Sequence, residues 1–339
     1  MKEVKVSKIK SVEYVGESNR LYDLEVKNNH NFFAENVLVH NCHRAPSTAY
    51  ISLINRLDCK FRIGLTATPD RKDGRWPLAE EALGGVVARI KTESMKPIVY
   101  LKKTNFSPPR QWRGRQAYNK SVEFLSNSKE RNIDVIKQVF ADLRKQKKSS
   151  IIIPVKRVAH AKKLTRLINK QAAYNNDHRD EKWPDKLAEC LYGSSDKEKI
   201  LDNARSYKTR VVVAIEKFVC DGIDVPSWTH MYLLFPGNNE VKYTQMTARI
   251  LTPFDGKIQP VLRTWVDPID IMKNCAKATY KGVFLPLNYK FGEKTKLQYE
   301  ELVSERKVGK VWIKGDSNGR FEGPKNTTIS VRSMTATGF

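Results

Sequence analysis

Three consecutive residues, His40, Asn41 and Cys42, have side chains that can act on the peptide bonds beside them. The amide nitrogen of Asn41 can attack its own backbone carbonyl, which closes a succinimide and cuts the chain after Asn41. A histidine can assist this step near neutral pH by polarising the scissile carbonyl or protonating the leaving amine. A cysteine thiolate accepts acyl groups, so Cys42 adds a nucleophile on the other side of the bond.

Two upstream residues could complete this chemistry by folding back onto the bond between Asn41 and Cys42. They are His30 and Asp23, and Asp23 lies in an alternating segment typical of a β-strand. The run VLVHNC is also typical of a short apolar strand that ends in a turn. A motif of three residues is therefore only a hypothesis.

The wider pattern favours the first interpretation. The segments YDLEV, HNFF and VLVHN followed by Cys resemble the two C-terminal sequence blocks of inteins, the self-splicing protein elements. The resemblance implies that Asn41 cyclises, that His40 assists it, and that Cys42 is the first residue of the flanking protein and the second nucleophile. It also implies that Asp23 and His30 are the acid and the histidine of the upstream block.

Residues 1–41 lack the block that starts splicing in an intein, which needs an N-terminal Cys or Ser and a Thr-x-x-His segment. Met1 precedes Asn41 by only 40 residues. We therefore expect residues 1–41 to be the C-terminal fragment of a split intein, a small all-β (Hint) fragment, although an artificially truncated chain would look the same. A segment this short cannot close a core, so we expect it to be poorly ordered until its N-terminal half binds.

The charge of the chain favours a polyanionic partner. Its 339 residues, enough for two or three domains, carry a net charge of +24, whereas residues 1–41 hold six basic and six acidic residues. The excess therefore lies after Asn41 and favours DNA or RNA as a partner, with a solvated basic surface as the alternative.

Cysteine usage and hydropathy favour a cytoplasmic protein. The five cysteines are scattered without a C-x-x-C pair, which argues against a structural zinc site and a disulfide framework. The first ten residues are too charged for a signal peptide, and no apolar run approaches the length of a membrane span. We expect no metal in the chain itself and no membrane partner.

Residues 42–95 contain a buried-strand pattern that runs into Thr66-Ala67-Thr68-Pro69. Together with Cys42-His43, this GLTATP segment resembles superfamily 2 helicases of the DEAH-like, XPB and phage-repair type. In that family a strand ends in Asp-Glu-x-His, which holds Mg²⁺ and the attacking water, and only the x-His part is present here. The resemblance implies that His43 couples the nucleotide site to the second domain, and that Thr66 and Thr68 link hydrolysis to DNA movement. The intein and helicase resemblances thus meet at one peptide bond.

Residues 129–285 alternate helix and strand patterns, which predicts a parallel α/β sheet whose ligands bind beyond the carboxyl ends of the strands. The preceding residues 96–128 lack clear periodicity and suggest a linker or surface hairpin, in which Trp112 could stack on bases or lie in a solvated loop. One predicted helix has an apolar face that consists of Ile133, Ile136, Val139, Phe140 and Leu143. Four apolar runs are predicted to be strands: Ile151–Ile153, Val211–Ala214, Met231–Phe235 and Val261–Val266.

Three stretches in this region resemble motifs of the second helicase domain. The segment Ile151–Pro154, with the helix that follows it, resembles the motif that opens this domain. In RVVVAIEKFVCDGIDVPSW, Gly222 and Asp224 match positions that contact nucleic acid and the ATP ribose. In QMTAR, Gln245 and Arg249 match the Gln-x-x-Gly-Arg-x-x-Arg motif, which implies that Arg249 lies near the γ-phosphate, where a cation stabilises developing charge.

The QMTAR motif departs from the family pattern twice. Ala248 replaces the usual glycine, and Thr252 replaces the second arginine, which often drives hydrolysis. Weak ATPase activity, a substitute such as Arg263, and a degenerate enzyme all remain open.

The expected fold is mixed: an intein fragment, a partial α/β RecA-like domain in residues 42–95, and a complete α/β RecA-like helicase C-terminal domain. Residues 286–339 are basic and polar, and suggest a tail or small β module without assigned chemistry. The chain has no G-x-x-x-x-G-K-[ST] sequence, so we predict that it does not hydrolyse ATP alone.

Three interpretations follow from these patterns. The first is a split-intein half that joins its helicase part to a separately encoded N-terminal helicase part. Splicing needs no cofactor, and the spliced helicase needs ATP and Mg²⁺. The second is a nucleic-acid-binding helicase remnant with an inert intein segment. The third is a β-rich assembly module in which the HNC tripeptide is coincidental.

Overall fold

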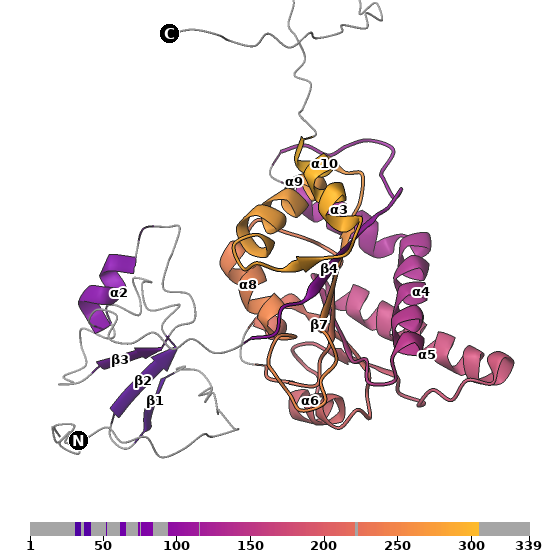
Figure 1. Ribbon diagram of the computed structural model, residues 1–339, viewed down its shortest axis with the longest axis horizontal. Helices are drawn as coiled ribbons and strands as arrows, with labels where there is room; N and C mark the ends of the chain where they lie inside the picture. The colour runs from indigo at the N-terminus through magenta and orange to yellow at the C-terminus, as the bar shows by residue number, and fades with distance from the viewer. Residues whose placement is uncertain are drawn as a thin grey trace, which may run out of the picture.

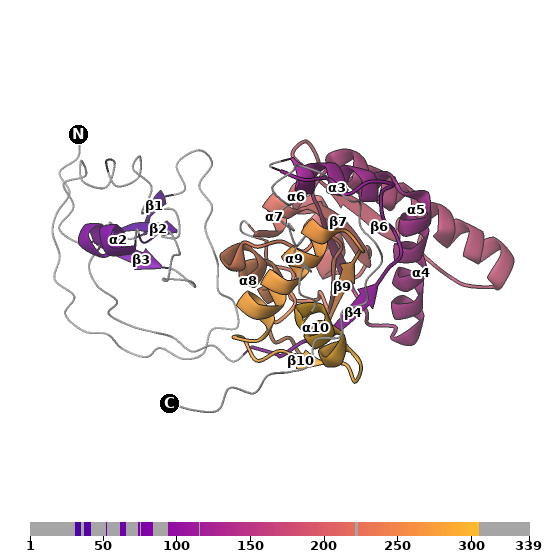
Figure 2. The same cartoon turned by 90° about the horizontal axis from the view of Figure 1, so that it is seen from above.

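The structure is a computed structural model that describes residues 31–34, 37–41, 62–65 and 76–83, the single residues 52 and 74, and residues 94–304 except 115, 221 and 222. Residues 94–304 form a seven-stranded sheet with helices packed on both faces (Figure 1, Figure 2). Among the described residues, no helix combines the length and apolar character needed to cross a membrane.

Every strand pair of the large sheet is parallel, and the strands lie in the order β10-β4-β9-β8-β5-β7-β6. The chain moves from β5 to β6 and β7 on one side and then returns to place β8 on the other. Ligands of open parallel sheets bind where the strand order reverses in this way, at the carboxyl edge. The strands are β4 (Ile98–Lys103), β5 (Ile151–Val155), β6 (Ala188–Leu191), β7 (Val211–Ile215), β8 (His230–Leu233), β9 (Val261–Val266) and β10 (Lys290–Phe291).

The central strands are buried on both faces, which explains their continuous apolar sequences. All five residues of β5 are buried. Ile151, Ile153 and Val155 pack into one hydrophobic core, whereas Ile152 packs into the other, as alternation along a strand requires. The predicted strand Val261–Val266 is confirmed residue for residue.

The helices divide between the two faces. Helices α3, α4 and α5 cover the Ile151 side, and α6, α8, η2 and α10 cover the Ile152 side. Their bounds are α3 (Ala117–Asn127), α4 (Lys129–Lys145), α5 (Val158–Arg179), α6 (Lys197–Arg205), α7 (Glu216–Cys220), α8 (Glu240–Ala248), α9 (Asp270–Thr279), the π-helical turn η2 (Tyr280–Phe284) and α10 (Thr295–Ser304).

The predicted apolar face of α4 is correct at four of its five positions. Ile136, Val139, Phe140 and Leu143 are buried, but Ile133 is 41% exposed. The reason is that α4 begins at a Ser128 cap, and its first turn faces the sheet with polar residues rather than with isoleucine.

Residues 96–128 differ from the predicted linker because they contain β4 and α3. Strand β4 pairs with β9 along all six of its residues, and its inward side chains Val99 and Leu101 are buried. Helix α3 then ends at Ser128, which caps α4 by accepting a hydrogen bond from the backbone N–H of Arg131. Two inward residues per strand are too few to show a period in the sequence.

Residues 286–304 also belong to this fold, which the sequence did not indicate. Strand β10 extends the sheet beside β4, and α10 buries Tyr299 and Leu302 in the core (Figure 2). Only two core residues in a polar segment anchor α10, so composition alone suggested a tail. Residues 305–339 lie outside the described part.

The described N-terminal elements form a separate three-stranded sheet. Strand β1 (Asn31–Ala34) pairs antiparallel with β2 (Val37–Asn41), and β2 pairs parallel with β3 (Arg62–Leu65). Helix α2 spans Trp76–Leu83. The strands agree with the β pattern expected in residues 31–41, while the assignment to an intein fragment stays a prediction.

Candidate functional site

The predicted Gln245 and Arg249 lie on α8 and at its end. Gln245 is half-buried, and Arg249 is the residue on which the helix ends. The Arg249 guanidinium donates from Nε to the carbonyl of Val219 at 3.0 Å and from Nη2 to the carbonyl of Cys220 at 2.8 Å. These carbonyls close α7, directly before the predicted Gly222 position. The two helicase-like motifs, about 30 residues apart in sequence, are therefore held together by Arg249.

The predicted Asp224 is exposed on the same loop. Its backbone carbonyl accepts hydrogen bonds from Nε and Nη2 of Arg205, at 3.2 and 3.0 Å. Arg205 ends α6, so the loop is tied to a rigid element while the Asp224 carboxylate faces solvent.

The remaining predicted site residues lie at the end of β2 or outside the described residues. His40 and Asn41 are the last two residues of β2, where they pair with Gly64 and Leu65. The others lie outside the described residues: Asp23, His30, Cys42, His43, Thr66, Thr68 and Gly222.

A charged cluster that the sequence did not single out lies at the carboxyl edge. Glu216 follows β7 directly and its side chain is only 4% exposed. It forms ion pairs with Lys156, which follows β5, at 2.6 Å, and with Lys242 in the first turn of α8. The cluster therefore joins three elements and carries one negative and two positive charges.

The protonation of the cluster follows from burial and charge. Burial lowers the pKa of Lys156 more than Glu216 raises it, so its net shift is downward. Burial also lowers the pKa of Lys242, but Glu216 outweighs this effect, and the net shift is upward. Burial raises the pKa of the neighbouring Tyr118 far above its usual range, and Glu216 adds to the rise. Tyr118 therefore stays neutral, with its ring 5.3 Å from the Lys156 ammonium.

The chemistry of this edge is that of anion binding. Arg157 and Lys217 are exposed beside the cluster, at the starts of α5 and α7. Together with Lys156 and Lys242 they give four cations, against the buried Glu216 and the exposed Glu123, which forms an ion pair with Arg157 at 3.4 Å. In the described part of the chain, no group of three or more His, Cys, Asp or Glu residues could hold a metal ion.

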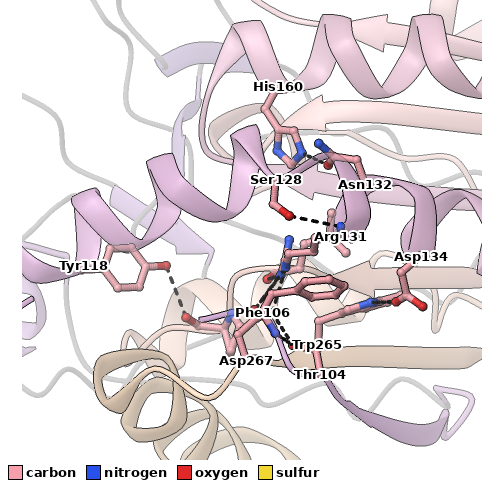
Figure 3. A network of polar contacts seen from close by, with 12 residues as sticks. Thr104, Phe106, Tyr118, Ser128, Arg131, Asn132, Asp134, His160, Trp265 and Asp267 are labelled. Atoms are coloured by element: carbon pink, nitrogen blue, oxygen red, sulfur yellow. Dashed lines mark hydrogen bonds and ion pairs between the residues drawn. The ribbon is translucent and has the colours of Figure 1, made fainter. Parts of the chain in front are cut away.

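A second, buried network of polar contacts lies at the same edge of the sheet, at the ends of β8, β9 and β4 (Figure 3). The Arg131 guanidinium of α4 donates to both carboxylate oxygens of Asp267, at 2.9–3.2 Å, and to the carbonyl of Leu234 at 2.6 Å. Thr104 donates to Asp267 at 2.6 Å. Asp267 directly follows β9, Thr104 follows β4, and Leu234 follows β8. Arg131 and Asp267 together therefore connect three strand ends to α4. A charged residue on the apolar face of a helix, one turn before Val135, was the available sequence signal.

Arg263, which the sequence left open as a substitute arginine, is engaged elsewhere. It lies inside β9, and its Nε donates to Oδ2 of Asp142 at 2.6 Å. Tyr232 donates to the same carboxylate, and the Arg263 guanidinium lies 5.0 Å from the Tyr100 ring. Burial raises the pKa of Asp142, but Arg263 outweighs it and holds the pKa below the usual value. Arg263 is thus an internal ion-pair partner in this structure.

Comparison with known proteins finds a similar protein that is named as a helicase, but no matching family model. No protein-family model matches the chain. The chain is 21% identical over 235 residues to "Putative helicase 22" of Sulfolobus islandicus filamentous virus, an alignment that covers 64% of this chain and 40% of that protein. The chain therefore spans less than half the length of this relative.

Solved structures give weaker likenesses. One is a fragment described as a putative HsdR subunit of a type I restriction enzyme from Vibrio vulnificus, with a TM-score of 0.49, 16% identity and coverage of 67% of this chain and 42% of that chain. Another is S. cerevisiae Dbp5 bound to RNA and ADP BeF3, with a TM-score of 0.47, 12% identity and coverage of 78% and 62%. The chain is thus similar in sequence to a viral protein named as a helicase, and it contains an all-parallel α/β sheet.

Proposed function

We propose that this chain is a trans-splicing C-intein that carries the C-terminal part of an ATP-dependent DNA helicase as its C-extein. The observation that carries the proposal is that two independent sequence patterns meet at one bond, between Asn41 and Cys42. The intein-like pattern ends at Asn41, and the helicase-like pattern begins at Cys42. The likeness to "Putative helicase 22" supports the second half of the proposal.

The proposed splicing step uses the residues around this bond. The Cys42 thiolate attacks the (thio)ester that links the N-terminal extein to its intein half, and the extein acyl group moves to the Cys42 sulfur. The Asn41 side-chain nitrogen then attacks its own backbone carbonyl, and His40 protonates the amine of Cys42 as it leaves. The freed amine attacks the thioester, so the acyl group moves from sulfur to nitrogen and a peptide bond forms. Asp23 and His30 would assist these transfers.

In the proposed spliced helicase, the RecA-like sheet would work with an N-terminal domain that supplies the phosphate-binding loop. ATP and Mg²⁺ would be its cofactors, and Arg249, bonded to the carbonyls at the end of α7, would face the phosphates across the domain cleft. Gln245 and Asp224 would contribute from the same side. His43, Thr66 and Thr68 would couple hydrolysis to movement.

The carboxyl edge of the large sheet is the proposed nucleic-acid interface. Four cations gather there, and their two carboxylate partners, Glu216 and Glu123, leave an excess of two positive charges. Phosphate contacts from such lysine and arginine side chains supply most of non-specific affinity. The net charge of +24 agrees with a polyanionic partner.

Intact mass spectrometry tests the splicing proposal. The chain is mixed under reducing conditions with partners that end in Asp-Glu followed by an N-terminal intein half. The expected product joins the partner extein to residues 42–339 and releases residues 1–41. Asn41→Ala should block cleavage and trap an unspliced or branched species, whereas the control Asn36→Ala should splice. Equal splicing by both variants would refute the assigned role of Asn41.

Gel-shift and anisotropy measurements test the nucleic-acid proposal separately. Arg157→Gln/Lys217→Gln removes two edge cations, and Lys137→Gln/Lys296→Gln removes two exposed lysines elsewhere. We expect the first pair alone to weaken binding and to reduce the salt slope by about 1.4 for single strands. If the chain binds DNA but no partner ligates, the inert-intein interpretation replaces the first.

A further inference from the structure

Helix α5 carries a ridge of exposed side chains that the proposed motifs do not use. The ridge consists of Lys162, Arg166, Lys170, Tyr174 and His178, spaced four residues apart along one row of the helix. Neighbours in such a row lie about 6 Å apart along the axis, so the ridge is about 24 Å long. We define these five residues as the α5 ridge.

The basic part of the α5 ridge is not neutralised by the protein. All three cations are exposed. Within residues 94–304 as described, neither Arg166 nor Lys170 forms an ion pair. The single acidic residue of α5 is Asp177, in its last turn. An uncompensated row of positive charge at regular spacing is complementary to a polyphosphate backbone.

The far end of the ridge adds an aromatic platform. Tyr174 is 49% exposed, and its ring stacks on the His178 ring with centroids 4.2 Å apart and planes 13° apart. Nδ1 of His178 lies 3.0 Å from the carbonyl of Tyr174 and donates a hydrogen bond to it, which fixes the pair. Tyr174 thus keeps one ring face for an unstacked base. Aromatic faces that follow a basic track are typical of single-strand binding sites.

The ridge also begins at the carboxyl edge of the sheet. Lys162 lies one turn inside α5, and its ammonium is 4.5 Å from the ring of Tyr192, which follows β6. The helix then runs away from that edge and projects beyond the rest of the described fold in both views (Figure 1, Figure 2). A strand bound at the edge can therefore continue along the helix.

We propose that the α5 ridge is an auxiliary binding track for single-stranded nucleic acid, with phosphates on Lys162, Arg166 and Lys170 and a base on Tyr174. This inference rests on the proposed nucleic-acid function and extends it to a surface outside the helicase-like motifs. A track of about 24 Å would lengthen the bound segment by several nucleotides.

Fluorescence anisotropy of the full chain with labelled oligo-dT of about 8 and about 20 nucleotides tests the track. Arg166→Gln/Lys170→Gln removes two ridge cations, and Lys137→Gln/Lys296→Gln is the charge-matched control at exposed positions. We expect the ridge pair to weaken binding of the long oligonucleotide about tenfold and to lower its salt slope by about 1.4, with little effect on the short one. Circular dichroism checks that the helix content of each variant is unchanged.

The aromatic platform is tested by Tyr174→Ala against Tyr174→Phe. Alanine should weaken long-oligonucleotide binding by about tenfold, because base stacking is lost, and phenylalanine should preserve it. Ridge variants that bind the long oligonucleotide as well as the control pair would overturn the track while leaving edge binding in place. If the unsubstituted chain binds neither oligonucleotide, that result would instead overturn the nucleic-acid function and the track together.

Discussion

The buried pair of Arg131 and Asp267 gives the sharpest test of how the carboxyl edge is held. Both side chains are 0–1% exposed, and the guanidinium makes three hydrogen bonds to the carboxylate. Asp267→Asn keeps the volume but leaves the arginine charge buried with a neutral partner. Removal of one partner of a buried ion pair costs about 3–5 kcal/mol, a large part of the stability of about 5–15 kcal/mol typical of a domain.

Urea unfolding followed by tryptophan fluorescence measures this loss, because Trp228 and Trp265 are fully buried. The double variant Arg131→Met/Asp267→Leu removes both charges and should recover much of the loss, since apolar replacement of a buried pair is often neutral. The Asn substitution alone should therefore be worse than the double variant. A cost below about 1 kcal/mol for Asp267→Asn would refute the claim that this pair holds the strand ends.

Three further predictions concern pH, the C-terminal helix and the face of α4. Burial, with a smaller contribution from Arg131, lowers the pKa of His160 to about 3. Between about pH 6.5 and pH 3 the imidazole therefore binds a proton in the unfolded chain but not in the folded one. The contribution of His160 to folding stability is full above about pH 6.5, and about 2 kcal/mol of it is lost by pH 5. His160→Gln should flatten the pH dependence of urea unfolding by that amount, and an unchanged profile would contradict a neutral buried histidine. Tyr299→Ala should lower the unfolding free energy by about 3–5 kcal/mol. The control Leu297→Ala, at a residue 62% exposed, should change it by no more than about 0.5 kcal/mol. Equal effects of the two substitutions would mean that α10 does not pack as described. Ile136→Ala should cost about 2–5 kcal/mol and Ile133→Ala far less in the same assay, and the reverse order would refute the orientation of α4.

Sequence patterns predicted the central part of the fold well because its strands are buried on both faces. Such strands need long apolar, β-branched runs, and a run like RVVVAI is visible without any structure. The strand predicted at Val211–Ala214 was located to within one residue for this reason, since β7 spans Val211–Ile215. The helical period identified α4, and its one error, Ile133, is the fifth residue of the helix, directly after the buried polar residues Arg131 and Asn132 of the first turn.

The edges of the sheet escaped prediction because few of their residues are buried. Strand β4 and helix α10 each place only two residues in the core, Val99 and Leu101 or Tyr299 and Leu302. Two residues do not make a detectable period, and the partners of β4 lie more than 150 residues away. Only tertiary pairing could assign these segments to the sheet.

The sequence by itself determined which chemistry could be proposed for this chain. The His-Asn-Cys tripeptide, the GLTATP and QMTAR segments and the basic excess are all local or compositional, so they can be found without coordinates. Tertiary structure decided which charged side chains lie close enough to form ion pairs. It placed Lys156 and Lys242 against Glu216 and paired Arg263 with Asp142. Among the described residues it gave Arg166 and Lys170 of the α5 ridge no ion-pair partner. Charges interact through space over a few ångströms, whereas their sequence separations range up to about 120 residues, and that difference is why only the fold could reveal them.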